Sequence, residues 1–230
     1  GRNWQYPEGT WPQRRRCHEE HRDFALGLMW FLQNDPSVGT QRDVFRQFRL
    51  CADEWVDNGH LPEEMYVRET RRILARHVLS EHDLSPQPAT NAARAFDDSV
   101  AFTDWYMDSH SCDEDATYGE PCSADFPYDG KLILTEQMRP GQVPYRCLLP
   151  RGVDNLLVPV CLGATHVAWG AVRLEPCLMH LGEVAGFAAV AALRDGRLPG
   201  TLDPAAFAAS LPALGVQTTM PRPAAATTAR

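Results

Sequence analysis

The sequence lacks several short motifs that bind nucleotides or support hydrolysis. No two of its 16 glycines are separated by a single residue, so it contains no G-x-G. This excludes both the dinucleotide fingerprint and the P-loop within the chain. The G-x-S-x-G turn of hydrolases and the H-E-x-x-H zinc helix are absent too. Lysine is nearly absent: among 22 basic residues only Lys131 is a lysine, which leaves one position for chemistry that requires an amine.

The seven cysteines form no C-x-x-C pair, and they are scattered along the chain. An odd, dispersed set predicts reduced thiols in a cytoplasmic protein, most of them acting as small buried hydrophobic residues. A zinc site formed by His110, Cys112 and Cys122 is the weaker alternative, because a ten-residue spacing between the cysteines is untypical of structural zinc. We therefore predict no metal.

The charge balance is acidic, with 30 acidic and 22 basic residues and a net charge of −8. An acidic chain gives no sign of binding nucleic acid or an anionic membrane, and 44% hydrophobic content indicates a folded globular protein. Residues 155–172 carry no charged residue over nearly the length of a membrane span. Because Pro159, Gly163 and Gly170 interrupt this stretch, it favours a strand followed by a turn.

Hydrophobic spacing predicts helices in the first part of the chain. Residues 1–18 are polar and are expected to form a solvated lead-in. A helix is predicted over residues 19–33, and a second one from Thr40 to Val56, where apolar residues recur at helical spacing before Asn58-Gly59. The segment 65–73 is typical of either a solvated helix or a strand.

Strands are predicted in the middle of the chain, and helices near its end. Strands are expected at 96–107, 131–134 and 145–149, with a loop over 108–129, and 155–162 reads as a buried strand. After a turn over 163–173, Pro176 favours the start of a helix that runs to about Leu193. A short helix is predicted over 203–211, and the last dozen residues are expected to be mobile.

The segment 155–193 is the most informative part of the sequence. It would deliver a loop containing Thr165, His166 and Arg173 to the N-terminus of a helix, where free amides and the helix dipole favour an electron-rich or anionic group. A binding site and ordinary packing of a helix on a sheet both agree with this spacing.

A resemblance to a known family favours the binding site. The segments 145–150, 155–166, 173–176 and 179–186 resemble the C-terminal signature of the FAD-dependent oxidoreductase family, whose members are often labelled xanthan lyase-like. The segments 67–72, 81–83, 98–99 and 108–110 resemble the same family. Each motif is short, but their order and spacing agree over roughly residues 20–195.

The resemblance implies a mixed α/β (α+β) fold. It implies the C-terminal part of an FAD-binding Rossmann-like fold of the glutathione-reductase type, together with an antiparallel substrate region. Residues 1–150 would form the substrate region, 151–198 the strand, turn and helix that close over the flavin, and 199–230 a short helix and flexible tail. Since the Gly-rich segment that holds the ADP half of FAD is absent, the fold is expected to be incomplete without an N-terminal half on a separate or removed polypeptide.

The resemblance also implies a function and its residues. We expect hydride transfer between a small-molecule substrate and FAD, with a non-catalytic structural or regulatory subunit as the alternative. An apolar surface left by the missing half is expected to cause self-association. The expected catalytic residues are His166, Arg173 and His110, although His166 as a structural histidine and Arg173 as a loop anchor stay open. The expected cofactor-binding residues are Thr165, Pro176, Cys177, Leu178 and Met179.

Overall fold

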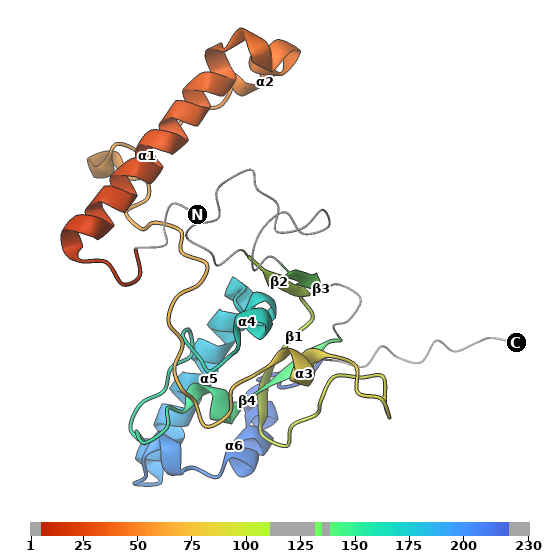
Figure 1. Cartoon of the computed structure of the whole chain (residues 1–230). Coiled ribbons are helices and arrows are strands. Elements are labelled where there is room, and N and C mark those ends of the chain that lie inside the picture. The colour runs from red at the N-terminus through yellow and green to blue at the C-terminus, as the bar shows by residue number, and fades with distance from the viewer. Residues whose placement is uncertain (1–5, 111–131, 135–138, 221–230) are drawn as a thin grey trace, which may run out of the picture. The chain divides into compact units, whose positions relative to one another are not determined.

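The computed structural model describes residues 6–110, 132–134 and 139–220 of the chain (Figure 1). Its residues divide into two compact units, Gly1–Thr70 and Arg71–Arg230. The described residues contain both helices and short antiparallel strands, with the four strands together between α3 and α4, so the predicted mixed α/β class is confirmed. The division at Thr70 falls inside the substrate region predicted over residues 1–150, and residues 71–150 lie in the same unit as the segment 151–198.

The first unit is built on one long helix, α1, which spans Trp11–Asn34. The Thr10 and Gln13 side chains form a capping box at its start, and Pro12 lies in its first turn, where the missing N–H costs nothing. The helix predicted at 19–33 is therefore confirmed. The lead-in predicted for residues 1–18 is wrong from Trp11 onward, because these start signals lie eight residues earlier than expected.

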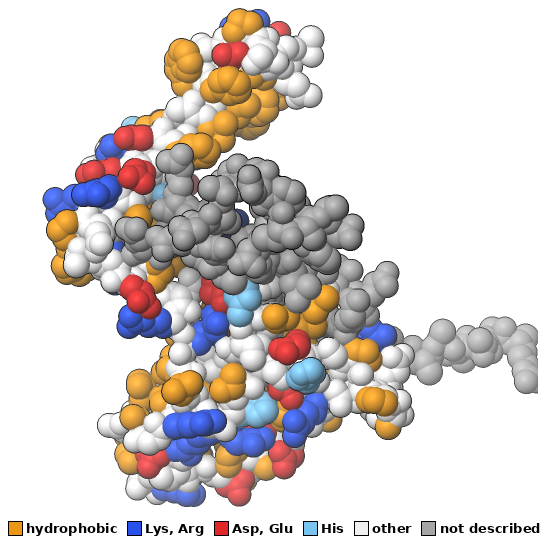
Figure 2. All heavy atoms as spheres, in the orientation of Figure 1, with side chains coloured by type: hydrophobic (Ala, Val, Ile, Leu, Met, Phe, Trp, Pro, Cys, Tyr) orange, Lys and Arg blue, Asp and Glu red, His pale blue; other side chains and the backbone are white. Residues whose placement is uncertain are grey.

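The second helix predicted in this unit is wrong. Instead of a helix from Thr40 to Val56, a 3₁₀ segment (Pro36–Gln41) leads into a single turn, α2 (Arg42–Phe45), and a further 3₁₀ turn spans Val56–Asn58. The apolar side chains that suggested a helix are largely exposed, and Figure 2 shows hydrophobic side chains on the surface of α1 and α2. Helical spacing without a surface to pack against does not stabilise a helix in water.

The second unit contains two small antiparallel ladders. Strand β1 (Ser99–Thr103) pairs with β4 (Gly141–Pro144), and β2 (Met107–Ser109) pairs with β3 (Leu132–Leu134). The expected strand at 96–107 is thus present but divided, and the one at 131–134 is confirmed at 132–134. The strand predicted at 145–149 is wrong, because Tyr145–Leu148 forms a 3₁₀ turn directly after Pro144.

The segment 155–162 was predicted as a buried strand, and this is wrong. It has no regular secondary structure, and Leu156 and Val160 are exposed. Its backbone bonds are scattered: Val158 N–H donates to Leu148 O, and Cys161 O accepts from Ile73 N–H. The segment 65–73 likewise forms neither helix nor strand.

Three α-helices follow: α4 (His166–Val172), α5 (Glu175–Arg194) and α6 (Pro204–Ser210). The last two confirm the predicted helices. The expected turn over 163–173 is wrong in part, because Thr165 caps a helix there by accepting from Ala168 N–H. A short helix α3 (Glu81–Leu84) precedes the strands, and 3₁₀ turns lie at Pro199–Thr201 and Leu211–Leu214.

One hydrophobic core holds this second unit together. It is formed by buried residues from Leu79 to Val216, including one face of α5, the inner residues of β1 and β4, and most of α4. Within the described residues α5 is long and apolar enough to cross a membrane, a property that core helices of globular proteins share.

Candidate functional site

The junction between α4 and α5 lies directly against β2. Gly170 of α4 makes the approach possible: a Cβ on this residue would lie 2.6 Å from the backbone oxygen of Asp108. The next residue of α4, Ala171, accepts a hydrogen bond of 2.6 Å at its backbone oxygen from Thr103 Oγ1 at the end of β1. Because Gly170 has no side chain, α4 can lie close to β2. The two-residue link Arg173-Leu174 that follows α4 therefore lies near Asp108 of this strand.

A chain of three polar side chains crosses this contact. Arg173 Nη2 lies 3.0 Å from Asp108 Oδ2, and His110 Nε2 lies 3.2 Å from the same oxygen. Arg173 is nearly buried, with 10% of its side chain exposed, whereas His110 is 38% exposed. The structure thus brings together two of the three predicted catalytic residues. Asp108, which belongs to the family-like segment 108–110, links them.

The N-terminus of α5 follows immediately. Leu174 at the N-cap offers no side-chain acceptor, and the first bond of the helix runs from Leu178 N–H to Leu174 O. Pro176 has no N–H, and within the described residues the backbone N–H groups of Glu175 and Cys177 have no partner. These two donors and the helix dipole give this end a partial positive charge.

The predicted residues of this first turn have different surroundings. Met179 is exposed and Leu178 is half-buried, whereas Cys177 is buried in the core. Burial raises the pKa of the Cys177 thiol to about 12. Cys177 therefore contributes its backbone to the helix end, while its side chain is a neutral packing group.

Thr165 and His166 lie at the opposite end of α4, which has seven residues and a length of about 10 Å. The Thr165 hydroxyl donates to Glu81 Oε2 at 3.2 Å and accepts from Ala168 N–H. Arg72 lies at the same end, since its Nε donates to Ala164 O at 2.8 Å. The structure does not bring Thr165 and His166 together with Arg173.

Two motifs of the sequence form structural networks elsewhere in the second unit. In the segment 81–83, Asp83 is buried; it accepts from Ser80 N–H and lies 3.1 Å from His77 Nε2 and 3.3 Å from Arg94 Nη1. In the segment 98–99, Asp98 is also buried and binds Arg146 through two guanidinium nitrogens, at 2.8 and 3.0 Å. Both carboxylates anchor loops of the second unit.

Sequence reasoning missed Glu81 and the link from Asp108 to Arg173. Glu81 could have been found from the sequence, since it belongs to the family-like segment 81–83. The pairing of Arg173 with Asp108 could not, because Asp108 lies 65 residues earlier in the chain. Among the described residues no group of three His, Cys, Asp or Glu side chains is arranged to hold a metal. The cysteines of the alternative zinc site, Cys112 and Cys122, lie outside the described residues.

Comparison with known proteins gives one match. The model of a family described as FAD dependent oxidoreductase matches residues 2–211. No curated protein and no solved structure matches the chain. Since the family model covers most of the 230 residues, the chain belongs to the FAD-dependent oxidoreductase family.

Proposed function

We propose that this chain forms the flavin-facing part of an oxidoreductase that transfers hydride between a small-molecule substrate and FAD. The family is FAD-binding, which supports a redox function. The observation that carries the proposal is the uncapped N-terminus of α5, preceded directly by Arg173 and, through Asp108, by His110.

The donor set at this end of α5 fits one edge of the cofactor. The pyrimidine edge of a flavin is rich in oxygen and nitrogen acceptors, and the Glu175 and Cys177 amides offer two fixed donors beneath a positive dipole end. FAD, when bound, supplies the ring that accepts the hydride. The chain's contribution would be to donate hydrogen bonds from the Glu175 and Cys177 amides and to keep that edge in a defined orientation.

The three linked side chains suit the proton that leaves with the hydride. Oxidation of an alcohol or amine removes a proton from oxygen or nitrogen, and His110 is the exposed member of the chain. Asp108 holds the imidazole, and Arg173 holds Asp108. We therefore assign His110 as the proton acceptor and Arg173 as the cation that fixes this carboxylate.

Thr165 and His166 have a different place in the proposal. The Thr165 hydroxyl is engaged both as a donor to Glu81 and as an acceptor at the start of α4. We propose that Thr165 acts as a helix cap. We also propose that His166 binds the substrate and takes no part at the N-terminus of α5. His166→Gln would then alter KM more than kcat.

The ADP half of FAD requires residues that these 230 do not provide. No Gly-rich turn exists in the sequence, and the segment 155–162 is irregular instead of a strand of a flavin sheet. We propose that a partner segment, the N-terminal FAD-binding half, supplies the pyrophosphate site. This chain and the partner segment would both lie in the cytoplasm, where the scattered cysteines would stay reduced.

Comparison of three flavins tests this proposal. If the chain contacts only the ring, then FAD, FMN and riboflavin bind with similar, weak affinity, measured by quenching of flavin fluorescence. Arg173→Gln should weaken riboflavin binding by about tenfold, because it removes the cation that lies beside the Asp108 carboxylate and leaves the negative charge of Asp108 at the site with the His110 imidazole as its neighbour. Arg173→Lys should restore much of the binding, and Arg197→Gln, which removes an exposed cation elsewhere, should change nothing.

The outcomes separate the possible functions. FAD that binds far more tightly than riboflavin would show an ADP site in this chain and refute the need for a partner segment. If no flavin binds, the alternative of a non-catalytic structural or regulatory subunit is favoured. The irregular segment 155–162 is the observation that keeps this second function in view.

A further inference from the structure

Two aromatic side chains lie on the loop that joins β1 to β2, and we call this pair, Trp105 and Tyr106, the aromatic platform. Their rings are stacked, with centroids 4.7 Å apart and planes inclined by 26°. This separation is within the range of offset-stacked aromatic pairs in folded proteins. Tyr106 packs against the hydrophobic core, whereas Trp105 is 39% exposed. Trp105 therefore lies on a support that is itself fixed, and part of its indole ring faces solvent.

The backbone of Trp105 is held at the candidate site. Thr103 Oγ1 accepts a hydrogen bond of 3.3 Å from Trp105 N–H and donates one of 2.6 Å to Ala171 O. Ala171 lies two residues before Arg173, which pairs with Asp108. One hydroxyl thus joins the aromatic platform to the last turn of α4, directly before the link that leads to the N-terminus of α5.

This fixed arrangement favours a ligand over a purely structural role for Trp105. Holding an indole ring in one position costs side-chain conformational entropy, and a ring that stays exposed recovers only part of that cost by burial. The same fixation lowers the entropy cost of binding, because a preorganised ring needs no further ordering when a flat ligand stacks on it. The aromatic platform is therefore suited to a planar ligand.

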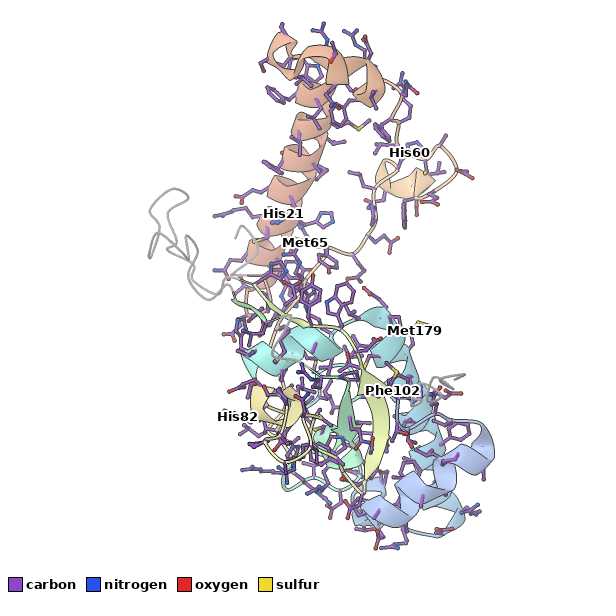
Figure 3. All side chains as sticks on the ribbon, turned by 90° about the vertical axis from the view of Figure 1, so that its right-hand side faces the viewer. His21, His60, Met65, His82, Phe102 and Met179 are labelled. Carbon is purple, nitrogen blue, oxygen red and sulfur yellow. The ribbon has the colours of Figure 1, made fainter. Side chains whose placement is uncertain are left out.

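The surface beside the N-terminus of α5 is apolar as well. Phe102 is the half-buried residue of β1, whose other residues are buried, and Met179 near the start of α5 is 74% exposed. His180 Nε2 lies 3.0 Å from Val100 O, so β1 and α5 are in contact here, and Figure 3 labels Phe102 and Met179 on this side of the second unit. A hydrated anion, the kind of ligand that helix N-termini favour, gains nothing from apolar neighbours. A planar ring with polar atoms along one edge fits both kinds of surface.

We propose that Trp105 stacks on the isoalloxazine ring of the flavin whose pyrimidine edge accepts hydrogen bonds from the Glu175 and Cys177 amides. This inference rests on the proposed function. It adds a surface for the flat face of the ring to the two donors that hold its edge. Tyr106 acts through Trp105 as a positioning residue, since its ring contacts the indole on one side and the core on the other.

Substitution of Trp105 in the full chain tests the aromatic platform, with riboflavin as the probe. Equilibrium dialysis measures the affinity, so that the result does not depend on quenching by Trp105 itself. Trp105→Leu is expected to weaken riboflavin binding by about tenfold, whereas Trp105→Phe should weaken it by no more than about threefold, because a ring face is kept. Trp55→Leu, which removes an indole of similar exposure (43%) from the first unit, is the matched control and should leave binding unchanged. Circular dichroism should show the same helix content in all three variants.

The fluorescence lifetime of bound riboflavin gives a second measurement, which a purely structural role of Trp105 does not change. An electron-rich indole in contact with oxidised flavin quenches its fluorescence, so the lifetime should be short in the native chain. Trp105→Phe should lengthen it several-fold while riboflavin stays bound, since a phenyl ring stacks without donating an electron.

The outcomes separate this inference from the proposed function. If riboflavin binds equally well to the native chain and to Trp105→Leu, the aromatic platform is overturned while the flavin site at α5 stands. If riboflavin does not bind to the native chain, the proposed function fails, and this inference fails with it. Indole that binds at Trp105 without displacing riboflavin would assign the aromatic platform to an aromatic substrate and overturn the stacking on flavin.

Discussion

Gly170 and Gly186 lie in neighbouring helices, and the structure gives them opposite surroundings. A Cβ at Gly170 would lie 2.6–2.8 Å from backbone atoms of Asp108, whereas a Cβ at Gly186 would meet nothing within 4 Å. Backbone atoms of a paired strand cannot move aside as the end of a flexible side chain can. The contact between α4 and β2, and with it the position of Asp108, therefore depends on the missing side chain at Gly170.

The same substitution at these two glycines should have effects of opposite sign. Gly170→Ala is expected to lower the free energy of unfolding by about 1–3 kcal/mol, because α4 must separate from β2. Gly186→Ala should raise it by up to about 1 kcal/mol through helix propensity alone. Urea unfolding at low protein concentration measures both. Equal effects of the two variants would contradict the close approach at Asp108.

Two buried cysteines predict how stability changes with pH. Burial raises the pKa of Cys177 to about 12 and raises that of Cys147 as well, whereas an unfolded thiol ionises near about 8.5. Between these values the unfolded chain loses protons that the folded chain keeps. The free energy of unfolding should therefore fall as pH rises above about 8.5, by up to about 1.4 kcal/mol per pH unit for each thiol.

Unfolding in urea at pH 7.5 and 9.5, on the native chain and on Cys177→Ala, checks this effect. The variant should lose part of the pH dependence, because one of the raised pKa values is removed. Cys51, which is exposed, provides the matched control: Cys51→Ala should leave the slope unchanged. A slope that is the same in all three proteins would show that Cys177 ionises normally in the folded chain.

At the scale of elements, the sequence predicted the helices whose start signals and packing partners are local. The helices at 176–193 and 203–211 have Pro near their first turn, and each buries an apolar face. The expected helix from Thr40 to Val56 had helical spacing and an end signal at Asn58-Gly59, but its apolar residues have little surface to pack against. The prediction of a strand at 155–162 was wrong for a related reason. A strand needs a second strand to pair with, and the spacing of apolar residues in one segment does not show whether such a partner exists.

The candidate site was predictable to the same extent. The pairing of His110 with Asp108 is local in sequence, and the helix end at Pro176 follows from propensity and hydrophobic pattern. The ion pair from Arg173 to Asp108 joins residues 65 positions apart. It exists because Gly170 admits the strand, and no local pattern encodes a close approach between two elements that are distant in the chain.

At the scale of the whole molecule, the hydrophobic core lies almost entirely in the second unit. The core cluster runs from Leu79 to Val216, whereas in the described part of the first unit Cys17 is the single buried hydrophobic residue. The first unit instead has an apolar groove of about 230 Å³ between α1 and α2, lined by Leu28, Met29, Leu32, Phe45 and Phe48 among others. Such an open arrangement buries little surface, so its stability is expected to be low.

The division at Thr70 predicts that residues 71–230 fold alone. The whole core lies within them, and the junction around Arg68, Arg71 and Arg72 has no regular secondary structure, so trypsin should cut there first. The full chain should unfold in two steps, and the expressed fragment 71–230 should show only the later one at the same urea concentration, by tryptophan fluorescence and circular dichroism. A single cooperative transition in the full chain, together with an unfolded fragment, would mean that α1 and the segment after it supply part of the second unit's stability. With a folded fragment, the flavin comparison can be repeated on it directly, because Asp108, His110, Arg173 and the N-terminus of α5 all lie within its bounds.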